Sequence, residues 1–493
     1  MVKNNTVRKF LEACEKHSEN TAIFRKENCI TYSQLLQKTK VFAAIFTKKN
    51  FRKILIATPA GEYAYAAMLA SLASDATYAP LNLLSSLEKK QRIVEIFQPD
   101  VIIGNQQEID ALCGGNAKCT TLSIESMKAS AELYKNTDIQ IFPSRRPAYV
   151  IFTSGSTGVP KGVVVGRQAL DHYVEWMSDR LFITPQDRVS QYANIAFDLS
   201  VMEIYGALCA GASLCPIESF FDRMRPARMI AGKEISVWIS VPSVINLMQQ
   251  SQELTVQNLK TVKQFVFCGE ALLVSQARAL QQILPDSKIL NTYGPTETTV
   301  SVTEIEVTEK LLQETHFPSV TLGNPIHDMN LSLVGINSDD GEIVITGPQL
   351  ADGYLNNPEA TQAAFRAVQT DHGPVLGYFT GDRGIRIDGK IYFAERLDFQ
   401  IKHKGYRIET EEIYSALSNI GYNNSCVLHM KQKIVVVLET PQIPDSSLIR
   451  KELSNALEHY AIPDVILNIP AFPRNDNGKI DRKKIQEIIK EKF

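Results

Sequence analysis

A segment rich in glycine and hydroxyl groups offers the clearest chemistry in this sequence. Residues 153–162 read T-S-G-S-T-G-V-P-K-G and directly follow a short apolar run. Glycine lets a backbone approach a ligand closely and adopt unusual dihedral angles, so the N–H groups and hydroxyls of such a loop can wrap phosphate oxygens. Lys161 adds a positive charge, although no G-x-x-x-x-G-K-[ST] pattern of a Walker A loop occurs here. The segment therefore predicts a phosphate-binding loop more strongly than an ordinary turn.

Other residues could hold the rest of a nucleotide. The flat ring of Tyr293 could stack on adenine, and the amide of Asn291 could meet its polar edge. Glu297 is a hard oxygen ligand of the kind that suits Mg²⁺ shared with phosphate. Asp382 could accept from ribose hydroxyls, and Arg396 could donate to the sugar or to phosphate. Taken singly, Tyr293 is better explained as part of a packed turn and Glu297 as a solvated carboxylate, and Asp382 could simply stabilise a turn.

Lys479 is the candidate for catalysis. It follows a glycine in a turn close to the last residues of the sequence. Attack of a carboxylate on an α-phosphorus concentrates negative charge on phosphate oxygens, which a preorganised ammonium stabilises more in the transition state than in the ground state. Without further context, an exposed lysine in a basic tail is the simpler interpretation, since Lys483 and Lys484 follow.

The order of these segments resembles the adenylate-forming superfamily, which includes acyl-CoA synthetases, luciferases and the adenylation domains of peptide synthetases. Residues 153–162 are similar to its T-S-G-S-T-G-x-P-K-G loop, and residues 291–297 to its N-x-Y-G-P-T-E. Residues 378–382 resemble Y-x-T-G-D, residues 396–409 resemble R-x-D-x-Q-x-K…G-x-R-x-E, and residues 477–482 resemble N-G-K-[IV]-D-R. With the flanking lengths, the likeness covers essentially the whole chain.

The resemblance implies ATP as co-substrate, Mg²⁺ on Glu297, Thr296 beside the α-phosphate and Lys479 as the catalytic residue. It also implies a hinge at Asp398, about which a small C-terminal domain swings to withdraw Lys479 and to bring Gly405 toward the adenylate. The implied ATP- and AMP-binding residues are Thr153, Ser154, Gly155, Ser156, Thr157, Gly158, Lys161, Asn291, Thr292, Tyr293, Gly294, Pro295, Thr296, Asp382, Phe393, Arg396 and Lys479.

Asp198 distinguishes the branches of this superfamily. Residues 197–200 resemble the F-D-x-S of amino-acid adenylation domains, in which the aspartate accepts hydrogen bonds from the substrate's α-ammonium. Facing a fatty acyl chain, the same carboxylate would be a buried charge without a counter-ion, which is costly. The sequence therefore favours an amino acid over a fatty acid, although Asp is also a favoured helix N-cap.

The side-chain pocket implied by the resemblance contains no Asp, Glu, Lys or Arg, which disfavours a charged substrate. Met202 and Val266 narrow the space, so the implied substrate is small. The pocket positions, next to Asp198, are Leu199, Met202, Ser240, Val266, Cys268, Thr292, Val300 and Ser301.

The wider strings at residues 197–202, 267–270 and 291–293 look most like the branch of D-alanine–D-alanyl carrier protein ligases. In that branch the cysteine of F-C-G-E crowds the α-carbon and favours the D-enantiomer, a role that the resemblance carries over to Cys268. A free cysteine is also commonly just a small buried hydrophobe. The predicted substrate is D-alanine, with L-alanine, glycine, serine and proline as alternatives; Ser301, more polar than alanine would require, keeps serine and glycine open.

Three positions depart from the family's pattern. Glu395 stands where Gly usually precedes the ribose-binding Arg, Phe393 where an aromatic hydroxyl is usual, and Asn475 where Thr usually precedes the terminal N-G-K. These departures could alter nucleotide affinity.

The resemblance implies two half-reactions at the interface of a large and a small domain. The amino acid's carboxylate attacks the α-phosphorus and pyrophosphate leaves; the phosphopantetheine thiol of a carrier protein then attacks the aminoacyl-adenylate and AMP leaves. No segment resembles a carrier domain, so we expect the carrier to act in trans. The alternatives are a CoA ligase, which Asp198 disfavours, and a non-catalytic adenylate-binding protein, which the joint presence of Lys161, Glu297, Asp382 and Lys479 disfavours.

The elements that must position these residues alternate short apolar runs with helical patterns over the first two thirds of the chain. Such alternation predicts layered, parallel α/β structure. Residues 341–345 and 390–393 predict antiparallel strands, and the last 95 or so residues predict a compact α+β unit with helices at 411–417, 447–457 and 482–490 and strands at 425–430 and 434–438. We therefore expect a large N-terminal domain over residues 1–397 and a small mobile domain over residues 398–493.

Composition narrows the class of protein. The 493 residues allow about three domain-sized units, and 52 basic against 54 acidic residues give a net charge of −2, which predicts no nucleic-acid partner. The first ten residues lack an apolar core and no run approaches about 20 apolar residues, so we expect neither a signal peptide nor membrane insertion. The 8 cysteines are scattered without a C-x-x-C pair, and the 8 histidines show no metal-site spacing. These features predict a soluble cytoplasmic protein.

Overall fold

The computed structural model describes residues 5–113, 120–134, 137–139, 141, 146–153, 159–370, 373–397, 400–474 and 480–490. Within them the chain divides into two compact units. The large unit contains residues 1–83, 90–152 and 161–397, and the small unit contains residues 84–89, 153–160 and 398–493. A hinge between two domains stays a prediction.

One sheet of the large unit is covered by helices on both faces. Along β3, Ile54 and Ile56 belong to the apolar core that includes α2 and α3, whereas Leu55 and Ala57 belong to the core that includes α4 and α5. This alternation follows from the two-residue period of a strand. The strand order is β18 (Gly353–Tyr354), β8 (Lys161–Gly166), β7 (Pro147–Thr153), β4 (Thr77–Pro80), β3 (Lys53–Ala57), β5 (Val101–Gly104) and β6 (Thr120–Ser123). The associated helices are α2 (Tyr32–Lys49), α3 (Glu62–Ala73), α4 (Leu87–Phe97), α5 (Gln106–Cys113) and α6 (Ile124–Tyr134).

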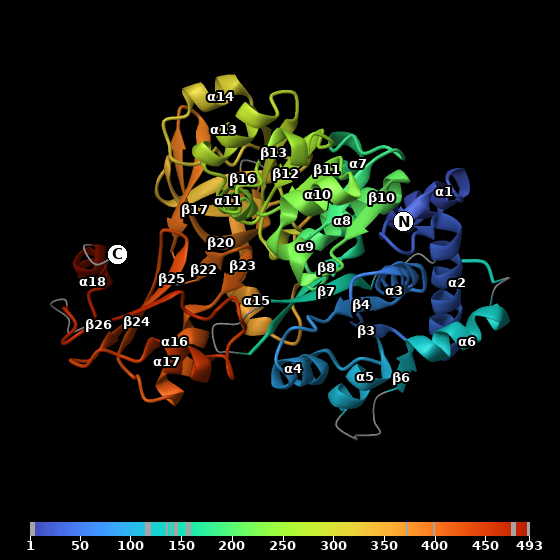
Figure 1. The fold of residues 1–493 in the computed structure, drawn as a ribbon, viewed down its shortest axis with the longest axis horizontal. Coiled ribbons are helices and arrows are strands. Elements are labelled where there is room, and N and C mark those ends of the chain that lie inside the picture. Colours follow the sequence, from blue (N-terminus) through green and yellow to red (C-terminus); the bar gives the residue numbers. More distant parts are fainter. Residues whose placement is uncertain are drawn as a thin grey trace. The chain divides into compact units, whose positions relative to one another are not determined.

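The second sheet of the large unit carries most of the predicted site. Trp238, Phe265 and Phe267 face the core that includes α10 to α13, while Val266 and Cys268 face the core that includes α7 and α8. Figure 1 labels the strands β10 to β13 and the helices α7, α8, α10, α11 and α13. The strand order is β15 (Asn324–Pro325), β14 (Thr303–Glu306), β13 (Lys288–Tyr293), β12 (Gln264–Phe267), β11 (Val237–Ser240), β9 (Arg188–Gln191), β10 (Ser213–Pro216), β1 (Thr21–Ile23) and β2 (Ile30–Thr31). The associated helices are α1 (Asn5–Lys16), α7 (Arg167–Arg180), α8 (Leu199–Ala210), α9 (Phe220–Met224), α10 (Pro226–Lys233), α11 (Ser243–Gln250), α12 (Val256–Leu259), α13 (Val274–Ile283) and α14 (Glu309–Glu314).

The remainder of the large unit is an antiparallel sheet. Gly341 lies opposite Gly384 and Ile385 opposite Tyr392, so the antiparallel strands predicted from the sequence at residues 341–345 and 390–393 are confirmed. The elements are β16 (Asn330–Asn337), β17 (Asp340–Thr346), β19 (Phe365–Thr370), β20 (Gly373–Ile387), β21 (Lys390–Arg396) and the helix α15 (Pro358–Ala364).

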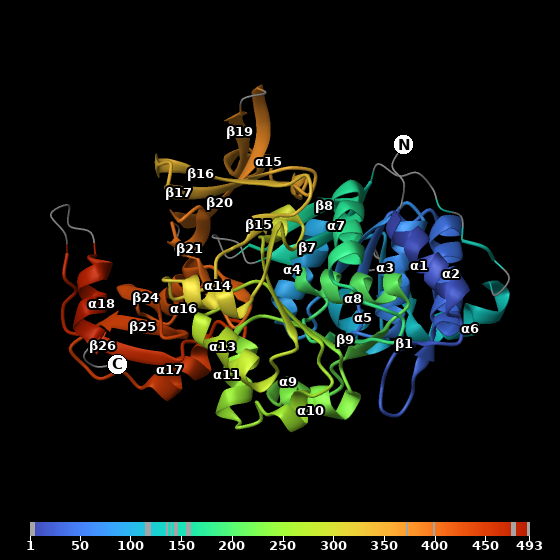
Figure 2. The same cartoon turned by 90° about the horizontal axis from the view of Figure 1, so that it is seen from above.

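The small unit has its own two-sided core. Val427 and Val436 pack with α16 and α17, whereas Val435 and Val437 pack with α18 on the other face of the sheet. Figure 2 shows α17 and α18 on opposite sides of β25. The helix predicted at residues 447–457 ends at Leu453 instead. The elements are β22 (Ile401–His403), β23 (Tyr406–Ile408), α16 (Thr410–Asn419), β24 (Ser425–Met430), β25 (Lys433–Glu439), α17 (Ser446–Leu453), β26 (Val465–Ile469) and α18 (Arg482–Lys490).

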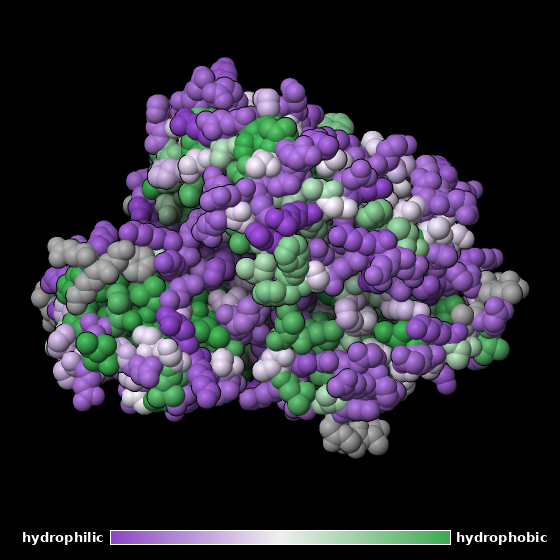
Figure 3. All heavy atoms as spheres, viewed as in Figure 1, coloured by the Kyte–Doolittle hydropathy of each residue, from purple (hydrophilic) through white to green (hydrophobic). Residues whose placement is uncertain are grey.

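The predicted α/β class, with a β-rich part and a small α+β unit, is confirmed by these sheets. Hydrophilic residues dominate the face seen in Figure 3, and apolar residues form separate groups among them. None of the helices in the described part of the chain is both long and apolar enough to span a bilayer.

Candidate active site

Four of the predicted pocket residues, Ser240, Val266, Cys268 and Thr292, lie at or next to the carboxyl ends of three neighbouring parallel strands. Ser240 lies opposite Phe267, and Phe267 opposite Asn291, so β11, β12 and β13 end side by side. The backbone N–H of Cys268 donates to the carbonyl of Ser240 at 3.3 Å, and the Thr292 hydroxyl donates to the carbonyl of Phe267 at 2.9 Å. Ligands of parallel α/β sheets generally bind at this edge.

The eight predicted pocket residues are all buried, and we refer to them as the Cys268 cluster. The thiol of Cys268 lies 3.6 Å from the carbonyl oxygen of Val300, which fixes its direction. Ser240 differs from the others, because its Oγ accepts from the indole N–H of Trp238 at 2.9 Å on the opposite side of the sheet from Val266. The members are Leu199, Met202, Ser240, Val266, Cys268, Thr292, Val300 and Ser301.

A strained turn forms one wall of the cluster. Thr299 and Val300 have φ angles of 61° and 72°, a region that β-branched residues rarely occupy. The Nε2 of the fully buried Gln349 donates to the carbonyls of Ser301 at 2.9 Å, Thr298 at 3.3 Å and Thr299 at 3.4 Å, and the Thr299 hydroxyl donates to the Gln349 carbonyl at 2.8 Å. Gln349 thus holds the turn in place. No sequence pattern points to Gln349, since a Gln between Pro and Leu carries no local signal.

The hydroxyl of Ser301 is engaged within the protein. It lies 3.0 Å from the hydroxyl of Tyr173, and both side chains are buried. This pairing satisfies the polar group that had kept serine open as a substrate. The cluster therefore presents a less polar surface than its composition indicates.

Asp198 stands at the N-cap position of α8, but its side chain makes no hydrogen bond to the helix end and its backbone is helical, with φ −63° and ψ −27°. The capping role that the sequence left open is therefore absent. Its neighbours include the buried Tyr149 and Tyr173, whose pKa values burial raises well above normal, with the Asp198 charge adding to the effect.

Glu203 positions the chain that leads to Asp198. Its carboxylate, fully buried on α8, accepts from the backbone N–H groups of Tyr192 at 2.6 Å and Ala193 at 3.1 Å. Burial raises the pKa of this carboxyl well above its usual value. The sequence analysis did not single out Glu203, because a lone glutamate in an apolar helix has no motif.

A second group, which we call the Asp382 corner, comprises Tyr293, Asp382 and Arg396. The Tyr293 hydroxyl donates to Oδ2 of Asp382 at 2.7 Å, and Arg396 donates to Oδ1 at 2.6 Å and to the carbonyl of Thr380 at 2.9 Å. Asp382 is fully buried and the Arg396 side chain is 11 % exposed. Burial raises the pKa of Tyr293 well above normal, and the nearby Asp382 charge adds to the effect, so the phenol stays a donor.

The surroundings of the corner fix the orientation of Tyr293. Asn291 donates through Nδ2 to the carbonyl of Thr321 at 2.9 Å. A Cβ on Gly294 would lie 2.6 Å from the Cα of Ser301, so only glycine fits there. Phe393 lies half-buried on β21, and Glu395, one of the departures from the family's pattern, forms an exposed ion pair with Arg383 at 2.7 Å.

Comparison with known proteins identifies the family to which this chain belongs. The family model described as AMP-binding enzyme matches residues 10–355. The chain belongs to the AMP-binding enzyme family. The predicted family, fold class and ATP-dependent ligase chemistry are thereby confirmed.

Relatives and solved structures in this family cover nearly the whole chain. A "D-alanine--D-alanyl carrier protein ligase" of Listeria monocytogenes serotype 4a is 33% identical over 86% of both chains, and one of Staphylococcus epidermidis is 31% identical over 96% of this chain and 97% of its own. The Vibrio cholerae adenylation domain AlmE, solved in complex with glycyl-adenosine-5'-phosphate, superposes with a TM-score of 0.85 at 26% identity, covering 100% of this chain and 98% of that one.

Among the described residues, the predicted phosphate-binding end of this AMP-binding enzyme holds oxygen donors and the ammonium of Lys161. Glu297 is fully buried within the 3₁₀ helix η1 (Thr296–Thr298), which follows Pro295. Its carboxylate accepts a hydrogen bond from the Tyr354 hydroxyl at 2.8 Å. The Lys161 ammonium lies 6.0 Å from the centre of the Tyr354 ring. Mg²⁺ prefers oxygen ligands. The Glu297 carboxylate, held by the Tyr354 hydroxyl and next to Thr296, is a set of oxygen donors that fits this ion.

Of the predicted phosphate-binding loop, Thr153 is described and is the last residue of β7. Several other predicted residues lie outside the described part of the chain. The loop residues Ser154, Gly155, Ser156, Thr157 and Gly158, the predicted hinge Asp398 and the predicted catalytic Lys479 lie outside the described residues.

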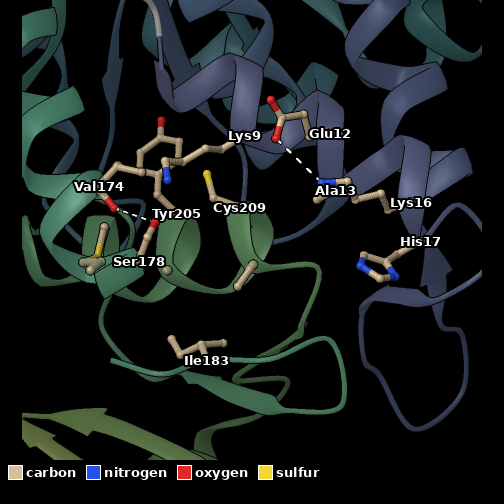
Figure 4. Close-up of a pocket in the computed structure, with 13 residues that line it drawn as sticks. Lys9, Glu12, Ala13, Lys16, His17, Val174, Ser178, Ile183, Tyr205 and Cys209 are labelled. Carbon is tan, nitrogen blue, oxygen red and sulfur yellow. Dashed lines mark hydrogen bonds and ion pairs between the residues drawn. The ribbon is translucent and has the colours of Figure 1, made fainter. Parts of the chain in front are cut away.

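A cavity of about 280 Å³ lies between α1, α7 and α8 of the large unit. Figure 4 shows Lys9 of α1 reaching toward Tyr205 and Cys209 of α8. Because none of its lining residues belongs to the predicted site, we assign this cavity no part in the family's reaction.

Proposed function

We propose that this AMP-binding enzyme activates a small uncharged amino acid, D-alanine in the first place, as its adenylate and passes the aminoacyl group to the phosphopantetheine thiol of a separate carrier protein. The observation that carries the proposal is the carboxylate of Asp198, which does not cap its helix and stands beside the buried, uncharged Cys268 cluster. An α-ammonium is the counter-charge that such a carboxylate recognises.

The Cys268 cluster supports the small side chain. Its members carry no formal charge, and the hydroxyls of Ser301, Ser240 and Thr292 already bond within the protein. A charged substrate side chain would remain unpaired there, which is costly. We propose that Cys268, held toward Val300, sets the enantiomer by crowding one side of the α-carbon.

Two small amino acids are the main candidates. D-Alanine is favoured by relatives at 31–33% identity whose names specify a D-alanine–carrier protein ligase. Glycine is the second candidate, because the AlmE structure, which covers the whole chain, holds a glycyl-adenylate.

We propose that the nucleotide is held at the Asp382 corner. Asp382 would accept from the ribose hydroxyls, Tyr293 would stack on adenine, and Thr296 and Lys161 would meet the phosphates. A carboxylate has about four acceptor directions, so Asp382 can bind the sugar while keeping its bonds to Tyr293 and Arg396. Mg²⁺, when bound to Glu297, would offset phosphate charge.

The chemistry is two displacements. An oxygen of the amino acid's carboxylate bonds to the α-phosphorus as the bond to pyrophosphate breaks, and the carrier's sulfur then bonds to the carbonyl carbon as AMP leaves. We propose that Lys479 stabilises charge in the first step and that rotation at Asp398 permits the second. Since ATP is consumed, we propose the cytoplasm as the place of reaction.

The test is amino-acid-dependent pyrophosphate release with both enantiomers of alanine and serine, glycine, proline and a short fatty acid. We expect strong preference for D-alanine and transfer to a carrier protein but not to coenzyme A. Preference for glycine would favour the second candidate, and activity with only the fatty acid would refute the role of Asp198.

A further inference from the structure

Two histidines and an aspartate meet on the surface of the large unit, although His172 lies far in the sequence from His327 and Asp328. One imidazole nitrogen from His172, one from His327 and one carboxylate oxygen from Asp328 all lie within 4.8 Å of one another. The imidazole rings of His172 and His327 have centres 6.4 Å apart. The histidines show no metal-site spacing in the sequence, because it is the fold that places them together.

The framework that presents these side chains is rigid. His172 projects from α7, and His327 and Asp328 are the two central residues of a turn closed by the N–H of Met329 donating to Ile326 at 3.0 Å. Ile326 and Met329 are 3 % and 4 % exposed, so their burial anchors the turn and directs its two central side chains outward. His327 and Asp328 are 83 % and 64 % exposed.

The hydrogen bonds orient His172 as a metal ligand. Nδ1 of His172 lies 2.8 Å from Oε1 of Gln349, an oxygen that only accepts, so Nδ1 carries the proton and Nε2 presents its lone pair. Metal-binding histidines commonly donate their second ring nitrogen to such a carbonyl. Nδ1 of His327 lies 2.8 Å from Oδ2 of Asp328, so these two groups already share one side of the site.

We propose that His172, His327 and Asp328 form a binding site for a divalent transition-metal ion, with Zn²⁺ as the best fit. Two imidazoles and one carboxylate match the ligand set that zinc accepts, whereas Mg²⁺ prefers oxygen ligands alone. Bonds of about 2.1 Å around a tetrahedral zinc place ligand atoms about 3.4 Å apart. Rotation of the exposed His327 and Asp328 side chains closes the remaining gap.

The experiment is a calorimetric titration of the full chain with Zn²⁺ in excess Mg²⁺, in a Cys29→Ser background that removes an exposed thiol. We expect one Zn²⁺ per chain and a loss of roughly tenfold or more in affinity for His327→Ala and for Asp328→Asn. Asparagine tolerates the left-handed backbone at residue 328, where φ is 60°, so the second variant keeps the turn.

The matched control is His316→Ala, which removes another exposed histidine and should leave Zn²⁺ affinity unchanged. Co²⁺ should give absorption bands of a tetrahedral site that disappear in His327→Ala. Equal Zn²⁺ affinity in the parent chain and all three variants would mean an adventitious ion only and would overturn the proposal. Because binding is measured without substrates, this outcome is independent of the proposed reaction.

Discussion

The Asp382 corner and the Cys268 cluster belong to the same unit and are both buried, but they satisfy their polar groups in different ways. The corner pairs opposite charges, with Asp382 held between Arg396 and Tyr293. The cluster uses neutral hydroxyls and backbone carbonyls, such as Ser301 with Tyr173 and Thr292 with Phe267. A buried charge pair depends on both partners, whereas neutral contacts are lost one at a time at lower cost.

This difference indicates at which positions a substitution should affect both function and stability. Removing a charge at the corner leaves its partner unpaired in a buried place, so nucleotide binding and folding should fail together. Changing a residue of the cluster alters shape and selectivity but leaves no charge behind. The following variants test that separation.

The largest effect is expected for Asp382→Asn. Loss of the charge leaves Arg396 without its counter-ion, which should cost about 3–5 kcal/mol of unfolding free energy and roughly a hundredfold or more in kcat/KM for ATP. Chemical denaturation and pyrophosphate release measure the two effects. The control is Asp340→Asn at the surface pair with Arg383, where we expect little change in either quantity.

Asp198→Asn should separate activity from stability. We expect kcat/KM for the amino acid to fall by roughly a hundredfold because the ammonium loses its charged partner. ATP affinity should stay the same, and the unfolding temperature should fall less than in Asp382→Asn, since Asp198 makes no capping hydrogen bond to α8. A variant that unfolds earlier but activates its amino acid normally would show that Asp198 is structural.

Cys268→Ala should change selectivity more than rate. Removing the sulfur next to Val300 opens space at the proposed α-carbon, so we expect the preference for one alanine enantiomer to fall by about tenfold. The matched control is Cys215→Ala, a buried cysteine in the core on the other face of the sheet, which should lower stability without altering the enantiomer ratio. An unchanged ratio for Cys268→Ala would leave Cys268 as a packing residue.

The last effect concerns acid and lies outside both regions. Burial, helped by the Lys404 charge, lowers the pKa of His403 to about 4, and burial lowers that of His429. A histidine whose pKa is depressed by folding stabilises the folded state above its unfolded pKa of about 6.5, and that contribution is lost as pH falls through its folded value. The small unit should therefore loosen between pH 6.5 and 4.

Hydrogen exchange at β24 and β25 measures this loosening. The tryptophans Trp176 and Trp238 both lie in the large unit, so their fluorescence should stay constant over the same pH range. A simultaneous change in both signals would contradict an origin at the buried histidines.

The sequence predicted elements better than it predicted the contacts between them. The phosphate-loop strand, the parallel layers and Tyr293 beside Gly294 follow from local patterns, since period and glycine content are local properties. Gln349 and Glu203 could not be found in this way, because each acts on backbone groups that only the fold brings within reach. The sequence predicts a polar pocket surface at Ser301 for the same reason. Its hydroxyl in fact pairs with that of Tyr173 on α7, a helix distant in the sequence.

The position of β1 in its sheet affects how the protein is made. Ile23 on β1 pairs with Leu214 on β10. About 190 further residues must therefore be synthesised after β1 before its parallel neighbour β10 is available. At about 5–20 residues per second, a ribosome needs roughly 10 to 40 seconds to supply them. During that interval β1 has only the short antiparallel β2 from the same sheet. The nascent chain thus carries an open sheet edge through about two fifths of its synthesis, which is when a chaperone would have most to protect.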